Sequence, residues 1–143
     1  MIAGQVRTRR ATAADLEAVR ALYAAGGYGG GVDVRGAVIV AVLDDAVVGA
    51  VRLCVEHGVR VLRGMQVGAG HRRRGIGRAL LAACDEAVGD EVAYCLPYAN
   101  LAAFYGRIGF RLAARDALPA FLQERLGGYA AAGQQVMAMV RAT

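Results

Sequence analysis

The hydrophobic and polar positions of this chain change their period along the sequence, and the changes separate expected strands from expected helices. Alternating or continuous apolar runs predict strands at Gln5–Arg9, Ala37–Leu43, Ala46–Val55, Val59–Val67, Glu91–Leu96, Phe110–Ala114 and Gln134–Arg141. Apolar residues three or four positions apart predict helices after Thr12 and at Gly75–Val88, Leu101–Ile108 and 119–126. Because the helix at Gly75–Val88 links two strands, we expect those strands to run parallel.

Capping and turn residues set the expected ends of these elements. Thr12 and Asp15 form a capping-box pattern, and Asn100 is the expected N-cap of the third helix. Gly127-Gly128 is expected to stop the last helix. Gly64 lies inside an expected strand and predicts a β-bulge or a close backbone approach. The expected buried faces are Leu16, Val19 and Tyr23 in the first helix and Ile76, Leu80, Ala83 and Ala87 in the second.

Length and composition narrow the class of protein. The 143 residues predict one domain spanning 1–143. No apolar run is long enough to cross a membrane, and the N-terminus lacks the apolar stretch of a signal peptide, so a cytoplasmic protein is expected. The net charge is +5 and comes from arginine, because the chain has no lysine. A positive surface suits an anionic partner, either a nucleotide-like cofactor or a nucleic acid.

The cysteines do not suggest a metal or disulfide framework. Cys54, Cys84 and Cys95 are odd in number and lack the Cys-x-x-Cys spacing of a zinc site. They are typical of small buried side chains in a reducing compartment. We therefore expect no metal site.

The stretch from Met65 to Leu81 reads as the end of a strand, a loop of glycines and arginines, and the start of a helix. The first N–H groups of a helix have no partner within it and lie at the positive end of its dipole. Glycines there allow an anion to approach the backbone, so the stretch is a candidate phosphate site. It is not a Walker loop, because Ile76-Gly77 stands where lysine and a hydroxyl are required.

Two motifs carry a resemblance to a known family. Arg72-x-x-Gly75-x-Gly77 resembles motif A of the GNAT superfamily of acyl-CoA-dependent N-acyltransferases, which binds the pyrophosphate of coenzyme A. The segment from Asn100 to Phe110, NLAAFYGRIGF, is similar to motif B of the same family and follows one strand later. The order of expected elements also resembles the GNAT fold. The resemblance implies an α/β (α+β) single domain with a mixed sheet of about six to seven strands, helices on both faces and a splay between the fourth and fifth strands.

The resemblance also implies a cosubstrate and the residues that hold it. The cosubstrate is acetyl-CoA, and the implied binding residues are Met65, Gln66, Val67, Arg72, Arg73, Arg74, Gly75, Ile76, Gly77, Arg78, Asn100 and Phe104. The pantetheine arm is expected to pair like a strand with the exposed edge near Met65 and Val67. The chain departs from the family pattern before Ala37, where a helix that helps to form the acceptor pocket is shortened.

The implied reaction is direct attack of a primary amine on the acetyl thioester. We expect the Val67 N–H to stabilise the oxyanion and the Tyr105 hydroxyl to protonate the departing thiolate. Tyr105 could instead be only a packed aromatic residue of its helix. The general base is left open between Glu56, His57, Asp33 and water, because the strand that carries motif A has no carboxylate.

Other readings remain open at the level of sequence. A GNAT-like module could bind acyl-CoA with little or no catalysis, and a nucleic-acid-binding protein is ranked last because no aromatic residues interleave with the arginines. The amine acceptor is not identified, and a homodimer is possible. The Ala24–Arg35 region, with Tyr28 and Asp33, is either a lid or a plain loop. The stretch Pro119–Tyr129 either packs against the sheet or lines the acceptor site.

Overall fold

A computed structural model of the chain describes residues 5–27, 36–72 and 75–142. Within these residues, seven strands form one sheet in the order β1-β2-β3-β4-β5-β7-β6. All neighbouring pairs are antiparallel except β4 and β5, which are parallel as the sequence predicts. The strands are β1 (Arg7–Arg10), β2 (Gly36–Leu43), β3 (Ala46–Glu56), β4 (Val59–Val67), β5 (Ala93–Cys95), β6 (Arg111–Leu112) and β7 (Met139–Arg141).

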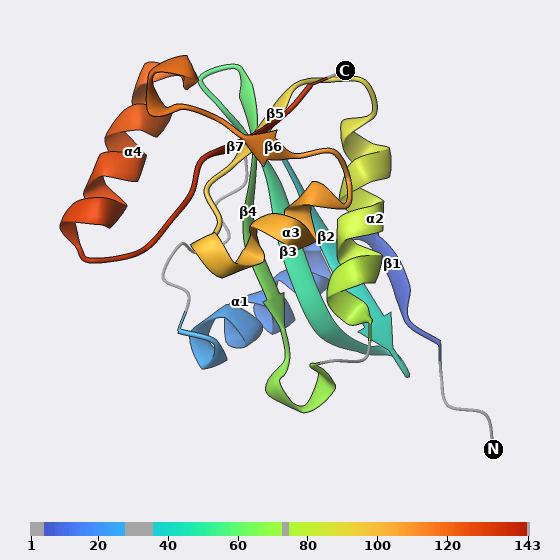
Figure 1. Cartoon of the computed structure of the whole chain (residues 1–143). Coiled ribbons are helices and arrows are strands. Elements are labelled where there is room, and N and C mark those ends of the chain that lie inside the picture. Colours follow the sequence, from blue (N-terminus) through green and yellow to red (C-terminus); the bar gives the residue numbers. More distant parts are fainter. Residues whose placement is uncertain (1–4, 28–35, 73–74, 143) are drawn as a thin grey trace.

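Helices cover both faces of the sheet (Figure 1). The described α-helices are α1 (Leu16–Ala25), α2 (Ile76–Val88), α3 (Ala102–Gly106) and α4 (Ala120–Ala131). Short 3-10 turns precede α1, α3 and α4, at Ala13–Asp15, Ala99–Leu101 and Arg115–Ala117, and a fourth lies at Ala69–His71. Helices α1 and α4 lie on one face and α2 and α3 on the other, so the expected α+β domain with a mixed sheet is confirmed.

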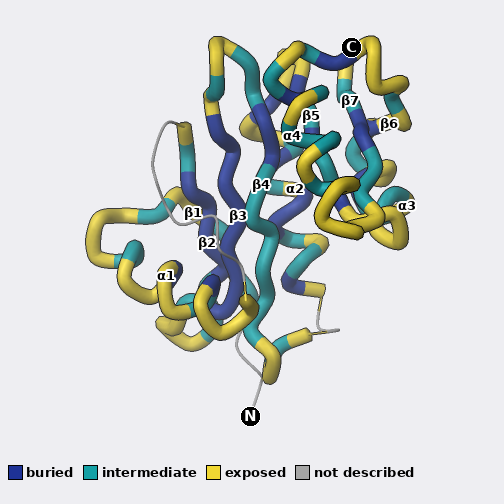
Figure 2. The backbone as a smooth tube through the Cα atoms, turned by 90° about the vertical axis from the view of Figure 1, so that its left-hand side faces the viewer, coloured by how far each residue is buried: buried dark blue, intermediate teal, exposed yellow. Residues whose placement is uncertain are grey.

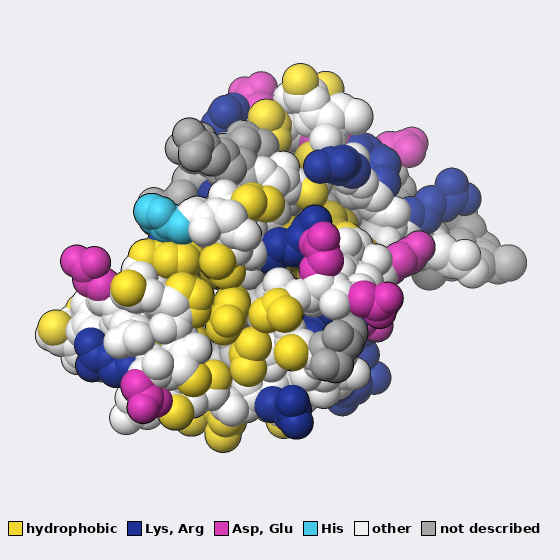
Figure 3. All heavy atoms as spheres, turned by 90° about the horizontal axis from the view of Figure 1, so that it is seen from above, with side chains coloured by type: hydrophobic (Ala, Val, Ile, Leu, Met, Phe, Trp, Pro, Cys, Tyr) yellow, Lys and Arg dark blue, Asp and Glu magenta, His cyan; other side chains and the backbone are white. Residues whose placement is uncertain are grey.

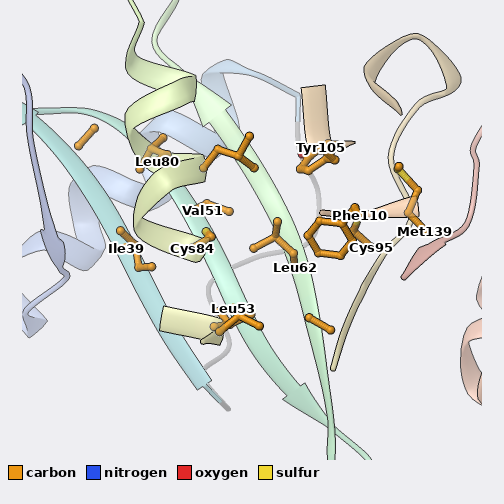
Figure 4. Packing of buried hydrophobic residues seen from close by; sticks show 14 of the residues in the cluster. Ile39, Val51, Leu53, Leu62, Leu80, Cys84, Cys95, Tyr105, Phe110 and Met139 are labelled. Atoms are coloured by element: carbon orange, nitrogen blue, oxygen red, sulfur yellow. The ribbon is translucent and has the colours of Figure 1, made fainter. Parts of the chain in front are cut away.

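The main core lies between the sheet and α2 (Figure 4). Leu80 and Cys84 of α2 are fully buried over Val51 and Leu62 of the central strands. The core then extends beneath α3, where Tyr105 and Phe110 pack with Cys95. On the opposite face α1 contributes Val19 and Tyr23, and α4 contributes Leu122. These contacts fix α2 and α3 against the same side of the sheet.

The sheet opens between β4 and β5. The two strands pair only from Arg60 with Ala93 to Leu62 with Cys95, and no pairing continues beyond Leu62 within the described residues. Figure 2 shows the consequence for burial: β2 and β3 are largely buried, whereas the second half of β4 is only half-buried. The expected splay between the fourth and fifth strands is therefore confirmed.

A β-bulge interrupts β4 just beyond this point. Ala50 pairs with Gln66 and Arg52 pairs with Arg63, so Gly64 and Met65 together face one residue of β3. Gly64 has φ +67°, a left-handed conformation that costs other residues about 1–2 kcal/mol. The extra residue reverses the alternation of side chains: Leu62 and Met65 both face α2, whereas Val61 faces α4. The bulge predicted from Gly64 is confirmed.

Several element ends differ from the sequence prediction. The predicted strands at Gln5–Arg9, Glu91–Leu96, Phe110–Ala114 and Gln134–Arg141 are shifted or shorter, because pairing ends where neighbouring strands diverge. Asn100 is not an N-cap; it lies exposed within the turn Ala99–Leu101. Ala87 is exposed, and Leu81, Cys84 and Val88 complete the buried face of α2.

The most distinct correction concerns α4, which runs through Gly127-Gly128 instead of stopping there. The apolar contacts of Leu122 hold the helix against the sheet, and they outweigh the cost of about 1 kcal/mol for each glycine in a helix. Gly127 also leaves room for a neighbour: a Cβ there would lie 2.9 Å from the Arg115 guanidinium.

Basic and acidic side chains alternate over the end of the molecule seen in Figure 3, around a central group of hydrophobic side chains. The positive net charge is therefore not gathered into one block on this face. None of the helices in the described part of the chain has the length and apolar character needed to span a bilayer. Tyr28, Asp33 and most of the Ala24–Arg35 region lie outside the described residues.

Candidate functional site

A cavity of about 470 Å³ lies where β4 and β5 separate. Its walls come from the bulged part of β4, the loop after β5, α3 and the second half of α4. It is lined by Gly26, Gly27, Val61, Leu62, Arg63, Gly64, Met65, Gln66, Cys95, Leu96, Pro97, Tyr98, Leu101, Tyr105, Arg125, Tyr129, Gln134 and Val136. The lining combines apolar side chains with phenol, amide and guanidinium groups, which is typical of a small-molecule site.

The start of α2 has the geometry of an anion site. Gly75 precedes the helix with φ +78°, and among the described residues other than its chain neighbours no atom lies within 4 Å of the position that a Cβ would take there. The first intrahelical bond joins the Ala79 N–H to the Gly75 carbonyl oxygen at 3.0 Å, so the N–H groups of residues 76–78 have no partner in the helix. The helix dipole adds a partial positive charge at the same place.

The backbone of β4 offers a second binding edge. The Gly68 N–H donates to the Val48 carbonyl oxygen at 2.8 Å, which makes these residues a hydrogen-bonded pair of the ladder. Such pairs alternate with non-hydrogen-bonded ones, so the next pair, Gly49 with Val67, is non-hydrogen-bonded. The N–H and C=O of Val67 therefore point to the side from which β5 has separated.

Helix α3 places two aromatic residues beside these features. Phe104 packs over the start of α2, and a Cβ added to Gly77 would lie 3.5 Å from the Phe104 ring. Tyr105 is buried and lines the cavity, in edge-to-face contact with Phe104 and Phe110 at centroid distances of 5.1 and 6.2 Å. Burial raises the pKa of Tyr105 well above its usual range, and the neighbouring thiols Cys95 and Cys84 raise it further. The hydroxyl therefore stays protonated at neutral pH.

An ion-pair group stands at the α4 side of the cavity. The Glu56 carboxylate accepts a hydrogen bond from Arg63 Nη1 at 3.1 Å and forms an ion pair with Arg125, whose Nη2 lies 2.6 Å from Glu56 Oε2. Burial raises the pKa of Glu56, but the hydrogen bonds and charge of Arg125 and then Arg63 outweigh it, so the pKa lies below its ordinary value. The Arg125 guanidinium also stacks over Phe121, 5.5 Å from the ring centroid. The neighbouring His57 is exposed and contacts the same ring.

The residues predicted from sequence divide into three groups. Met65, Gln66 and Tyr105 line the cavity. Val67, Gly75, Ile76, Gly77 and Phe104 surround the adjoining start of α2, with Arg72 and Arg78 exposed beside it. Arg73 and Arg74 lie outside the described residues, and Asn100 is exposed and does not line the cavity.

Sequence reasoning missed Arg63 and left Arg125 open between packing and an acceptor site. In helix α4, Leu122 packs against the sheet, and Arg125 and Tyr129 line the cavity. The sequence indicated these two residues only as one arginine in a strand and one in a helix. That both contact Glu56 could not be seen from any local pattern. In the described part of the chain, no cluster of His, Cys, Asp and Glu could hold a metal ion.

The comparisons with known proteins agree with this geometry. Residues 35–112 match the family model described as an acetyltransferase (GNAT) domain. A search of curated protein sequences gave no match. Solved structures with the same fold include the N-acetylglutamate synthase of Neisseria gonorrhoeae complexed with coenzyme A and N-acetyl-glutamate, at a TM-score of 0.70 and 20% identity. That match covers 96% of this chain but 35% of the synthase chain, so the chain spans about a third of that relative.

Relatives of similar length share the fold as well. An acyl-CoA N-acyltransferase from Pseudomonas aeruginosa has a TM-score of 0.69 at 21% identity, covering 97% of this chain and 99% of that one. Rv2747 from Mycobacterium tuberculosis, solved in complex with CoA and NLQ, has a TM-score of 0.68 at 17% identity, with 96% and 99% covered. The family match covers more than half of the sequence, and the chain therefore belongs to the GNAT family of acyl-CoA N-acyltransferases.

Proposed function

We propose that the protein, as a single catalytic domain over residues 1–143, transfers the acetyl group of acetyl-CoA to the primary amine of a small molecule or peptide. The observation that carries the proposal is the adjacency of three features on β4, α2 and α3. These are the open anion site at Gly75, the outward-facing backbone of Val67 and the protonated hydroxyl of Tyr105. Each corresponds to one part of acetyl-CoA: the pyrophosphate, the pantetheine arm and the thioester sulfur.

The residues present fit the cosubstrate. The N–H groups of residues 76–78 are suited to the pyrophosphate, and the exposed Arg72 and Arg78 add charge beside them. Among the residues that the structure describes, no strand pairs with β4 beyond Leu62 on the β5 side, so this edge can pair with the extended pantetheine amides. Phe104 packs beside the helix start, and its neighbour Tyr105 lines the cavity. Structures of relatives named above were solved with coenzyme A, which supports the same assignment.

Acetyl-CoA supplies an activated acyl group, and the chain supplies the orientation and the proton. The amine nitrogen attacks the thioester carbonyl carbon, a C–N bond forms and the C–S bond breaks. We assign the Val67 N–H to the oxyanion that forms at the carbonyl oxygen. Tyr105 donates its proton to the departing thiolate, because its raised pKa keeps it protonated in the site.

For the proton that the amine loses, we propose water rather than a side chain. Glu56 is engaged by two arginines that lower its pKa, so it is a weak base. His57 does not line the cavity, and Asp33 lies outside the described residues. An amine that arrives as its free base, or loses its proton to water in the cavity, needs no carboxylate within reach.

The test is calorimetric titration of the purified protein with acetyl-CoA, beside Gly75→Glu, Gly77→Ala and Tyr105→Phe. We expect binding by the parent, Gly77→Ala and Tyr105→Phe, and none by Gly75→Glu, which places a carboxylate and a strained residue at the anion site. An amine panel is then assayed for CoA release. Binding without release by any amine would favour a module that holds acyl-CoA without catalysis. A folded parent that does not bind acetyl-CoA would refute the proposal.

A further inference from the structure

The charged side chains that line the cavity are of one sign. Among its described lining residues the charged ones are Arg63, from β4, and Arg125, from α4, and no carboxylate lines it. Arg63 lies on the strand just before the bulge, and Arg125 reaches across from the helix that covers the same face. Two segments 62 residues apart in sequence, counted from residue 63 to residue 125, thus bring guanidinium groups to one small cavity.

Both guanidinium groups are held in place from behind. Glu56, at the end of β3, accepts a hydrogen bond from Arg63 through one carboxylate oxygen and forms an ion pair with Arg125 through the other. The three side chains are only 19–26% exposed, so the pairs are shielded from water. Glu56 itself does not line the cavity. Its role is to fix the direction of the two arginines, which is the pre-organisation that carboxylate recognition requires.

Arg125 retains an unused donor. Its Nη2 pairs with Glu56, whereas its Nη1 is buried and has no hydrogen-bond partner among the described residues. A buried donor without a partner is costly, so a hydrogen-bond acceptor placed against this side chain would be favourable. Phe121 beneath the guanidinium restricts its rotation. The remaining polar groups of the lining, including Gln66, Gln134 and Tyr129, are neutral.

We propose that the acceptor is a small amine that carries a carboxylate, an amino acid or a close analogue, and that Arg125 with Arg63 binds this carboxylate. The inference rests on the proposed acetyl transfer and names its substrate class. The neutral amine attacks the thioester while the carboxylate is held at the α4 side of the cavity. Polyamines, aminoglycosides and lysine-rich peptides lack this anionic group and would bring further positive charge to the arginines, so they are poor acceptors.

The test compares matched acceptors. Alanine, leucine and phenylalanine are each assayed beside their carboxamides and their decarboxylated amines, with CoA release as the readout. We expect kcat/KM for the amino acids to exceed that for both analogues by about 10²-fold. The carboxamide is a demanding control. Its amine has a lower pKa than that of the amino acid, so more of it is unprotonated near neutral pH, and without carboxylate recognition it would react faster.

Variants assign the effect to the arginines. Arg125→Gln should lower kcat/KM for amino acids by about 10²-fold, mainly through KM, and leave that for decarboxylated amines unchanged. Arg63→Gln should act in the same direction, and Arg125→Lys should restore part of the activity. Arg111→Gln, an exposed arginine of β6 outside the cavity, is the matched control for loss of one positive charge. Acetyl-CoA binding and melting temperature confirm that each variant is folded.

The outcomes separate the two proposals. If amines are acetylated but amino acids and decarboxylated amines react equally well, and Arg125→Gln changes neither, the carboxylate assignment is wrong and the acetyltransferase proposal stands. If the folded parent releases CoA with no amine of the panel and with no amine of a wider set, the acetyltransferase proposal itself fails. A preference for polyamines would also overturn the carboxylate assignment.

Discussion

Asp85 on α2 and Arg141 on β7 form an ion pair of 2.5 Å across 56 residues of sequence. The same guanidinium donates to the carbonyl oxygens of Gly89 and Ile108, both at 2.8 Å. One side chain thereby joins the last strand to the end of α2 and to the turn after α3. This relationship keeps the two helices that carry the candidate site in a fixed position relative to each other.

We therefore expect Arg141→Met to lower the free energy of unfolding by about 2–3 kcal/mol, because it leaves two carbonyl oxygens without their donor. Asp85→Asn should cost less than about 1 kcal/mol, since Asp85 is 48% exposed whereas Arg141 is 14% exposed. Urea unfolding of both variants checks this. Equal losses would mean that the ion pair, and not the carbonyl contacts, supplies the stability.

Gly75 and Gly77 lie two residues apart but should respond differently to alanine. Gly75→Ala forces a side chain into a left-handed conformation and should destabilise the protein by about 1–2 kcal/mol. Gly77 is inside the first turn of α2, where an added Cβ would make ordinary contact with Phe104, so Gly77→Ala should be neutral or stabilise by up to about 1 kcal/mol. Thermal unfolding of the two variants measures the difference, and a similar loss in both would contradict the assignment.

Tyr105→Phe should lower kcat by about 10²- to 10⁴-fold while leaving acetyl-CoA affinity unchanged, because the ring contacts are kept and only the proton donor is lost. Burial raises the pKa of Tyr105, so its acid form persists above pH 10. The parent's kcat should therefore show no alkaline decline up to about pH 10. Steady-state kinetics over pH 6–10 test both points, and an unaltered kcat in Tyr105→Phe would assign the residue to packing.

Val67→Pro removes the N–H that we assign to the oxyanion. Since the Val67 N–H lies outside the β3 ladder, the substitution should leave the sheet paired and lower kcat by about 10²- to 10³-fold. Gln66→Pro, one residue earlier, removes a ladder donor and should destabilise the fold. Circular dichroism and kinetics distinguish the two. A folded Val67→Pro variant with normal kcat would move the oxyanion donor elsewhere.

We expect the buried thiol of Cys84 to make the folded protein less stable at alkaline pH. Burial raises the pKa of its thiol from 9.0 to about 12, so the folded protein retains a proton that the unfolded chain releases. The contribution of the buried thiol to the free energy of unfolding is complete below pH 9. It is lost progressively as the pH rises toward 12, by an amount on the order of a few kcal/mol. Urea unfolding at pH 8, 9.5 and 10.5 should show this decline, with a shallower slope in Cys84→Ala. An identical slope would contradict it.

Local patterns predicted the elements whose structure depends on local chemistry. The three strands between Ala37 and Val67 appear almost at their expected bounds, because the turns that join them contain Asp44, Asp45 and Gly58, which adopt positive φ. The bulge at Gly64 and the start of α2 followed from single glycines in the same way. The family motifs then placed Tyr105 and the candidate anion site at the start of α2 on one side of the sheet.

Features that depend on distant partners could not be predicted. Gly127-Gly128 reads as a helix stop, but Arg115 packs against Gly127 and the buried Leu122 anchors the helix. Asn100 is a residue type that is common at N-caps, yet here it lies within the 3-10 turn that leads into α3. The link from Arg63 to Arg125 through Glu56 joins two strands and a helix, and no periodicity records it.

The bulge in β4 also limits how this protein can diversify. The extra residue lets one strand present Arg63 and Gln66 to the cavity while Met65, which also lines the cavity, packs against the core on the α2 side. Deleting one residue there would turn each side chain from Met65 onward to the opposite face of the sheet. Core residues would then be exposed, and the residues that line the cavity would leave it. With the acceptor bound as we propose, new acceptor preferences are therefore more accessible to evolution, and to engineering, by substitution at Arg63, Gln66 and Arg125 than by a change in the length of the strand.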